Sequence, residues 1–90
     1  MWIFEWDEEK NESNEKKHGV RFEDAIGVFS DEFALVYEDN DHGEQRWKAI
    51  GSGRYLMVLV VVYTYRNTIR IISARKASKQ ERKRYEQQKD

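Results

Sequence analysis

The sequence contains no cysteine, so it forms no disulfide, carries no thiolate nucleophile and offers no Cys-ligated metal site. Its longest apolar run covers residues 55–63, which is too short for a membrane-spanning helix of about 20 residues. The N-terminus lacks the basic segment and the small-residue cleavage site of a signal peptide. We therefore expect a cytoplasmic protein without a membrane partner, in keeping with a chain that has no disulfides.

Several catalytic motifs are also missing. The sequence has no Walker loop, no glycine-rich dinucleotide turn, no HExxH and no Gly-x-Ser-x-Gly elbow. Its two histidines, His18 and His42, stand at no metal-ligand spacing, and we expect His42 on the surface of an acidic loop. The sequence therefore predicts neither a metal site nor a cofactor.

The length of 90 residues is sufficient for only one small domain, which we expect to span residues 1–90. A domain of this size buries only about 60–65% of the surface that its unfolded chain exposes. Its stability is therefore expected to be low or to depend on a partner.

Charge is distributed unevenly along the chain. The net charge of −1 combines an acidic half, with 14 Asp and Glu against 4 Lys and Arg in residues 1–45, and a basic half. Residues 46–90 hold 12 Lys and Arg against 3 Asp and Glu. The basic residues could form a surface that binds a polyanion, or the two halves could interleave and cancel as surface ion pairs.

Hydrophobic periodicity and end signals predict an α+β fold. Asp7 and Gly19 are typical of the two ends of a first helix, and the apolar spacing over residues 22–29 predicts a short second helix. Ser78 and Glu81 form a capping box at the start of a last helix. Strands are expected at residues 1–6, 33–38, 45–50, 54–65 and 68–74. We expect an antiparallel sheet of four to five strands, two N-terminal helices and one C-terminal helix, with all helices on one face.

The second half interleaves arginines with tyrosines. Arginine binds phosphate in a bidentate manner, and aromatic rings stack on exposed bases. Arginines that keep one face of a sheet soluble would give the same pattern. The residues concerned are Arg66, Arg70, Arg75 and Arg82, with Tyr63, Tyr65 and Tyr85.

Three local arrangements could carry chemistry. Glu44 and Arg46 fall on the same side of a strand, as a base beside a phosphate clamp or as a plain surface ion pair. Lys17 and His18 end the first helix, as proton-transfer groups or as caps of its carbonyls. Arg75 stands where a strand meets the last helix, free to act there or paired with the acidic half, for example with Glu44.

Several motifs along most of the chain form one larger pattern. They are Phe4-Glu5-Trp6-Asp7-x-x-Lys10, Asn14-x-x-Lys17-His18-Gly19-Val20-x-Phe22-x-x-Ala25, Val28-Phe29, Glu44-x-Arg46, Gly51 and Ile69-Arg70-Ile71-Ile72-Ser73-Ala74-Arg75-x-Ala77-x-x-x-Glu81-Arg82-x-x-Tyr85. Taken together, these residues resemble the BrnT toxin family. One departure is Arg21, where a small N-capping residue is more usual before the second helix.

The resemblance implies a RelE-like fold and an endoribonuclease toxin of a type II toxin–antitoxin module. It also implies a hetero-oligomer with a BrnA-like antitoxin that neutralises the toxin and binds operator DNA, so that the toxin meets DNA only through the antitoxin. The expected outcome is inhibition of translation and growth. A non-catalytic module that uses the same basic face to hold RNA or antitoxin is the alternative.

On this interpretation RNA is cut without a metal, by attack of its 2′-hydroxyl on the adjacent phosphorus. The hypothesis assigns the phosphate to Arg75 and Arg46, the base to Glu44 or His18, and the acid to Lys17 or Tyr85. The expected substrate contacts are Arg66, Arg70, Tyr65 and Arg82.

Overall fold

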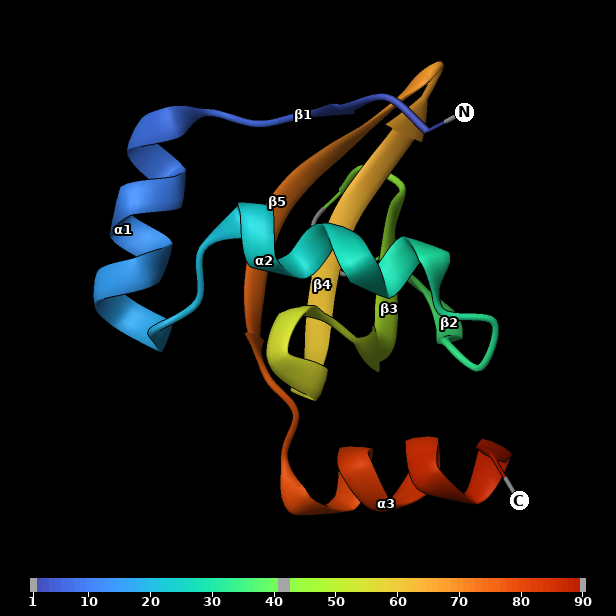
Figure 1. Cartoon of the computed structure of the whole chain (residues 1–90). Helices are drawn as coiled ribbons and strands as arrows, with labels where there is room; N and C mark the ends of the chain where they lie inside the picture. Colours follow the sequence, from blue (N-terminus) through green and yellow to red (C-terminus); the bar gives the residue numbers. More distant parts are fainter. Residues whose placement is uncertain (1, 41–42, 90) are drawn as a thin grey trace.

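The computed structural model describes residues 2–40 and 43–89, and His42 lies outside this range. It contains one five-stranded sheet with helices on both sides (Figure 1). None of the helices in the described part of the chain is long and apolar enough to cross a membrane. The elements are β1 (Phe4–Glu5), α1 (Glu8–His18), α2 (Phe22–Ala25), the 3-10 helix η1 (Ile26–Ser30), β2 (Leu35–Asp39), β3 (Arg46–Ser52), the 3-10 helix η2 (Arg54–Leu56), β4 (Val58–Arg66), β5 (Thr68–Lys76) and α3 (Lys79–Lys89).

The strand order β1-β5-β4-β3-β2 confirms the α+β class, but the sheet is mixed. Strands β2 to β5 pair antiparallel, whereas β1 pairs parallel with β5 at the edge. The expectation of an antiparallel sheet was therefore wrong for β1. Short turns dictate antiparallel pairing only between consecutive strands, and β1 and β5 are separated by most of the chain.

The main core lies between the sheet and α2 with η1, on what we call the helix-covered face. Phe22, Ala25 and Val28 of α2 and η1 are fully buried there, against β4 residues such as Leu59 and Val61. Strand β4 is apolar on both faces because it is the central strand and a second, smaller cluster forms on its other side.

That second cluster shows that the helices do not gather on one face, contrary to expectation. Tyr85 of α3 is 2% exposed and packs with Ile50 and Val60 on the opposite side of the sheet. Figure 1 shows α3 apart from α1 and α2, across one end of the strands. Tyr85 is the single buried side chain among the described residues of α3, which is why the helix has no apolar stripe in the sequence.

The helix ends follow the predicted signals. The Asp7 side chain accepts hydrogen bonds from the backbone N–H groups of Glu9 and Lys10, and Gly19 adopts φ 72° at the C-terminus of α1. Ser78 and Glu81 form the predicted reciprocal capping box at α3, with distances of 2.8 and 3.1 Å. These contacts fix where each helix begins and ends.

The second helix is shorter than its apolar spacing predicted. It is α-helical only over Phe22–Ala25 and then tightens into η1. Arg21 precedes it and makes no side-chain cap. Instead its guanidinium pairs with three carboxylates of the acidic half, those of Glu8, Glu15 and Glu23. This residue therefore joins α1 to α2 by ion pairs where a capping residue was expected.

The turn between β3 and β4 lies later in the chain than predicted. Strand β3 continues through Gly51 and Ser52, because Gly51 lets β3 approach η1: a Cβ there would lie 3.1 Å from Val28 and Ala34 side-chain atoms. The chain then reverses through η2, where Tyr55 and Leu56 both adopt φ 60°. The predicted turn between β4 and β5 is confirmed, with Asn67 at φ 65°.

Candidate functional site

Side chains of four neighbouring strands lie on the sheet surface that faces away from α1, α2 and η1, which we call the open sheet face. The register places Tyr37, Lys48, Val62 and Ser73 directly across from one another on β2, β3, β4 and β5. Strand alternation, together with the register shift between Val62 and Tyr63, puts Arg46, Arg70 and Arg75 on the same face. The open sheet face thus carries three arginines from two strands.

Arg75 lies at one end of this face, opposite Val60 and next to α3. Its two terminal nitrogens donate to the two carboxylate oxygens of Glu81 at 2.7 and 2.9 Å. Glu81 also accepts from the backbone N–H of Ser78, so the capping box that starts α3 holds the carboxylate in place. The Arg75 side chain is still 40% exposed, which leaves part of the guanidinium open to a ligand.

The same contact controls the charge of Glu81. Hydrogen bonds from Arg75 lower the pKa of the Glu81 carboxyl to about 2, and the Ser78 contacts act in the same direction against burial. Glu81 is therefore ionised at neutral pH. The sequence analysis allowed Arg75 to pair with a carboxylate of the acidic half, residues 1–45. In the structure its partner is Glu81, which lies six residues further along the basic half.

Arg46 and Glu44 form the second arginine–carboxylate pair. The Arg46 Nε atom lies 2.9 Å from Glu44 Oε1, and the Arg46 side chain is the more buried of the two, at 23% exposure against 57%. The predicted proximity of the two side chains is confirmed, although Glu44 precedes β3, which begins at Arg46. The exposed carboxylate beside a held guanidinium offers a proton acceptor next to an anion-binding group.

Arg70 and Arg66 occupy the end of the open sheet face nearest the β4–β5 turn. They line a hollow of about 440 Å³ together with Glu44 and Thr64. Arg70 lies 3.5 Å from Glu5 of β1, and both side chains are about half exposed. A surface pair of this kind contributes little to stability, so it can exchange for a ligand phosphate at small cost.

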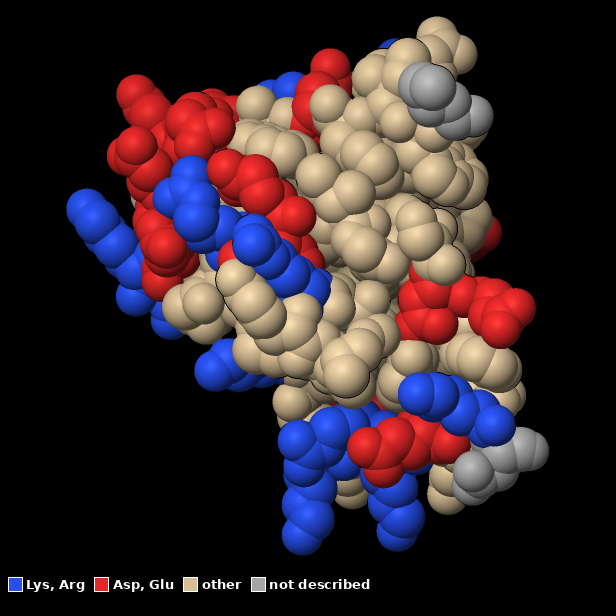
Figure 2. Space-filling view, in the orientation of Figure 1, with Lys and Arg blue, Asp and Glu red and all other residues tan. Residues whose placement is uncertain are grey.

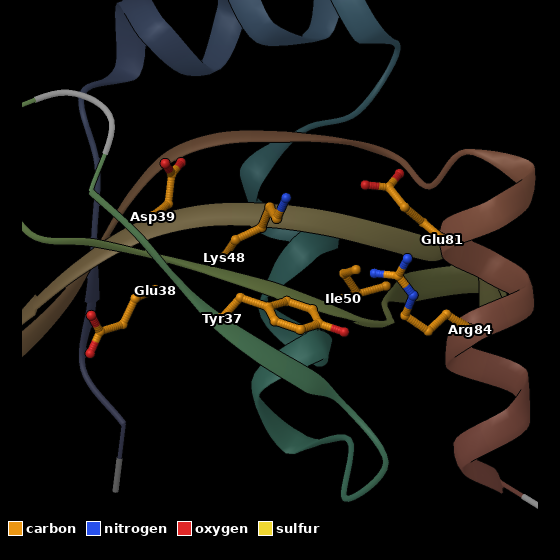
Figure 3. Close-up of a pocket in the computed structure, with 7 residues that line it drawn as sticks. All are labelled: Tyr37, Glu38, Asp39, Lys48, Ile50, Glu81 and Arg84. Carbon is orange, nitrogen blue, oxygen red and sulfur yellow. The ribbon is translucent and has the colours of Figure 1, made fainter.

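A second hollow of about 400 Å³ lies between β2, β3 and α3 (Figure 3). Tyr37 and Lys48 reach it from the strands, and Glu81 and Arg84 reach it from α3. Figure 3 shows Glu38 pointing away from this group, as strand alternation requires. The Lys48 ammonium and the Arg84 guanidinium extend the cationic character of the open sheet face toward the last helix.

Sequence reasoning missed Tyr37, Lys48 and Arg84. Lys48 follows Arg46 by two positions in a strand, and Arg84 follows Glu81 by three in a helix. A spacing of two in a strand and a spacing of three in a helix each place side chains on one face, so both residues could have been predicted from the sequence. Tyr37 carries no such signal, because only the β2–β3 register brings it opposite Lys48.

Five predicted site residues lie elsewhere. Lys17 and His18 end α1, which packs on the helix-covered side. Tyr65 projects from the helix-covered face and meets Trp2 edge-to-face at 6.4 Å. Tyr85 is buried beneath α3 and donates a hydrogen bond to Asp31 Oδ2. Arg82 is exposed on α3.

The environment of Tyr85 bears on its suggested role as an acid. Burial raises the pKa of its hydroxyl to about 12, and the hydrogen bond to Asp31 acts in the same direction. The hydroxyl also fixes α3 to the β2 side of the sheet, because Asp31 accepts from the backbone N–H groups of Ser52 and Phe33. Tyr85 thus has a structural function that accounts for its burial.

The two charge halves of the sequence partly interleave in space. Arg70 pairs with Glu5 and Arg54 with Asp24, whereas Arg75 pairs within its own half. Figure 2 shows acidic side chains over α1 and basic side chains gathered at the end of the molecule that carries α3. In residues 2–40 and 43–89, no group of three or more His, Asp or Glu is arranged to hold a metal ion.

Comparisons with known proteins point to one family. The family model described as "Ribonuclease toxin, BrnT, of type II toxin-antitoxin system" matches residues 6–81. The crystal structure of the Brucella abortus ribonuclease toxin, BrnT, superimposes with a TM-score of 0.71 at 28% sequence identity, covering 88% of this chain and 100% of that one. A comparison with curated proteins finds no match.

Proposed function

Because this chain belongs to the BrnT family of ribonuclease toxins of type II toxin–antitoxin systems, we propose that it is an endoribonuclease that cleaves RNA on the open sheet face. The observation that carries the proposal is that Arg46, Arg70 and Arg75, from two strands, all lie on that face. Guanidinium groups are suited to hold a phosphodiester and to stabilise the charge that develops on it during cleavage.

In the proposed reaction, Glu44 removes the proton of a ribose 2′-hydroxyl, and the resulting oxygen attacks the adjacent phosphorus. Arg46, whose Nε atom already lies 2.9 Å from Glu44, then neutralises the pentavalent phosphorane, and Arg75 turns from Glu81 toward Arg46 to neutralise it as well. The bond from phosphorus to the 5′-oxygen breaks, and this oxygen takes a proton from a nearby acid. The products are a 2′,3′-cyclic phosphate and a 5′-hydroxyl, and no metal takes part.

We assign the acid to Lys48. Its side chain shares the open sheet face with Arg46, two positions along β3, and lies directly across from Tyr37. Arg70, Arg66 and Arg84 contact the flanking phosphates at the two hollows. Glu81 is a weak base because its pKa is about 2, so its proposed role is to orient Arg75.

The other candidates receive structural roles in this proposal. Lys17 and His18 stand in the last turn of α1, where cations stabilise the helix dipole, and Tyr85 anchors α3 through Asp31. Arg82, which is exposed on α3, contacts RNA beyond the reacting phosphate. Tyr65 is exposed on the helix-covered face, so the proposal gives it no RNA contact.

We further propose that the partner is a BrnA-like antitoxin in a hetero-oligomer, that operator DNA is bound only through it, and that the free toxin acts in the cytoplasm on translation and growth. The polar α3, fixed mainly by Tyr85 and Glu81, supports the need for a partner.

The test is incubation of the purified protein with ribosome-free RNA in EDTA. The proposal predicts fragments that carry 2′,3′-cyclic phosphate, and an all-DNA version of the same sequence should stay intact because it lacks the 2′-hydroxyl. RNA that is cleaved only after Mg²⁺ is added would contradict the metal-free mechanism. RNA that is bound but remains intact, with or without ribosomes, would contradict catalysis itself.

A further inference from the structure

An apolar groove of about 320 Å³ lies on the helix-covered face, on the other side of the sheet from the arginines. Five of its seven lining side chains are aromatic: Trp2, Phe29, Trp47, Tyr63 and Tyr65. They come from the N-terminal segment, from η1 and from β3 and β4. The groove forms because β1 is only two residues long and α2 with η1 covers only part of the sheet.

The rim of this apolar groove exposes an unusual amount of apolar surface for so small a domain. Trp2 is 53% exposed, Val36 53% and Tyr65 56%, and Ile3 next to Trp2 is 59% exposed. Figure 2 shows this region as an extended uncharged surface beside α1. Contiguous exposed apolar surface of this kind marks a site for a macromolecular partner.

Charge distinguishes between a protein and RNA as that partner. None of the seven lining residues is charged. The acidic Glu38 projects from the same face of β2 as Val36 and lies directly across from Trp47 of the groove. Acidic side chains repel a phosphate backbone, whereas they attract lysine and arginine of a protein segment.

We propose that the apolar groove is the docking site of the antitoxin, for a segment with bulky apolar side chains flanked by basic residues. The inference takes from the proposed function only the existence of a protein antitoxin. Aromatic pockets with a polar rim carry most of the binding energy in protein interfaces, and here Trp2 and Tyr65 supply the walls. The antitoxin therefore has an anchoring point that is separate from the open sheet face.

The test compares Val36→Asp with Leu56→Asp. Both substitutions place a carboxylate at an exposed apolar position of the full chain, and Leu56, at 88% exposure on η2, does not line the groove. Affinity for the separately purified antitoxin is measured by titration calorimetry, and RNA cleavage is measured on each free toxin. Circular dichroism checks that both variants fold.

The expected result is that Val36→Asp weakens antitoxin binding at least tenfold and leaves the activity of the free toxin as in the wild type. Leu56→Asp should bind the antitoxin like the wild type. Glu38→Lys should also weaken binding, with a smaller dependence on salt than the wild type shows.

Three results would overturn the inference. Antitoxin affinity of Val36→Asp within twofold of the wild type would exclude the groove. Loss of RNA binding with intact antitoxin binding would assign the groove to RNA. A wild-type dimer that Val36→Asp converts to a monomer, with unchanged antitoxin affinity, would assign it to a second copy. If the wild type cleaves no RNA, the proposed function is wrong, but the antitoxin affinities still show whether the antitoxin binds in the groove.

Discussion

The side chain of Asn14 hydrogen-bonds to both backbone groups of Ala74. Its Nδ2 atom donates to the Ala74 carbonyl at 2.7 Å, and the Ala74 N–H donates to its Oδ1 atom at 3.2 Å. Strand β1 pairs with β5 only as far as Glu5 and Arg70. Beyond that point Asn14 takes the place of a neighbouring strand, and it also donates to the Val20 carbonyl at 2.8 Å. The polar helix α1 is thereby fixed to the sheet through a buried amide.

Asn14→Ala is expected to lower the free energy of unfolding by about 2–3 kcal/mol, because it leaves buried backbone groups of Ala74 and Val20 without partners. Asn14→Asp should cost at least as much, since a carboxylate cannot donate to the two carbonyls. Glu12→Ala, at an exposed position of the same helix, is the control and should change stability by less than about 0.5 kcal/mol. Urea unfolding measures all three; an Asn14→Ala variant as stable as the control would contradict this role.

Arg75→Ala is expected to abolish RNA cleavage while circular dichroism stays native, because the phosphorane loses a guanidinium. Glu81→Gln removes the same ion pair but keeps Arg75, so it should retain at least a tenth of the wild-type rate. Single-turnover cleavage of a labelled RNA measures both. Equal loss of activity in the two variants would mean that the pair matters for structure alone.

The Arg75–Glu81 pair also predicts a pH dependence of stability. The pKa of Glu81 is about 2 in the folded protein against an ordinary value of 4.5, so its contribution is complete above pH 5 and is lost as the pH falls toward 2. We expect this contribution to be ~1–3 kcal/mol. The difference in unfolding free energy between the wild type and Glu81→Gln should therefore shrink between pH 5 and pH 2. A difference that is constant over this range would rule out the pair as its source.

Tyr85→Phe separates an anchoring role from a catalytic one. Loss of the hydroxyl that donates to Asp31 is expected to lower stability by about 1–2 kcal/mol and to leave the cleavage rate unchanged. Tyr55→Phe, at a residue that is 73% exposed, is the matched control and should change neither quantity. A cleavage rate of Tyr85→Phe reduced tenfold or more, at full folding, would restore Tyr85 as the acid.

The parts of the fold that were predictable are those set by local chemistry. Asp7, Gly19 and the Ser78–Glu81 capping box act within four residues, so their spacing alone located the helix ends. The order of predicted strands and helices was enough to predict the α+β class. The side of the sheet that α3 occupies depends on the hydrogen bond from Tyr85 to Asp31, two residues that are 54 positions apart. A contact between such distant residues cannot be predicted from a local sequence pattern.

The candidate site was predictable to the same degree. Alternation along a strand placed Glu44 beside Arg46 correctly. It could not show that Arg46, Arg70 and Arg75 share a face, because a register shift between Val62 and Tyr63 changes the alternation of β5 relative to β4. The partner of Arg75 was likewise missed, since it depends on how α3 turns back over the sheet.

The central claim is that RNA binds on the open sheet face. Backbone amide shifts of the ¹⁵N-labelled protein, titrated with a 2′-O-methyl RNA that cannot be cleaved, test it most directly. The account predicts the largest shifts at Lys48, Val62 and Arg70, with little change at Val36 or Phe29 on the other side of the sheet. Shifts concentrated at Val36 and Phe29, with Lys48 and Arg70 unmoved, would contradict it.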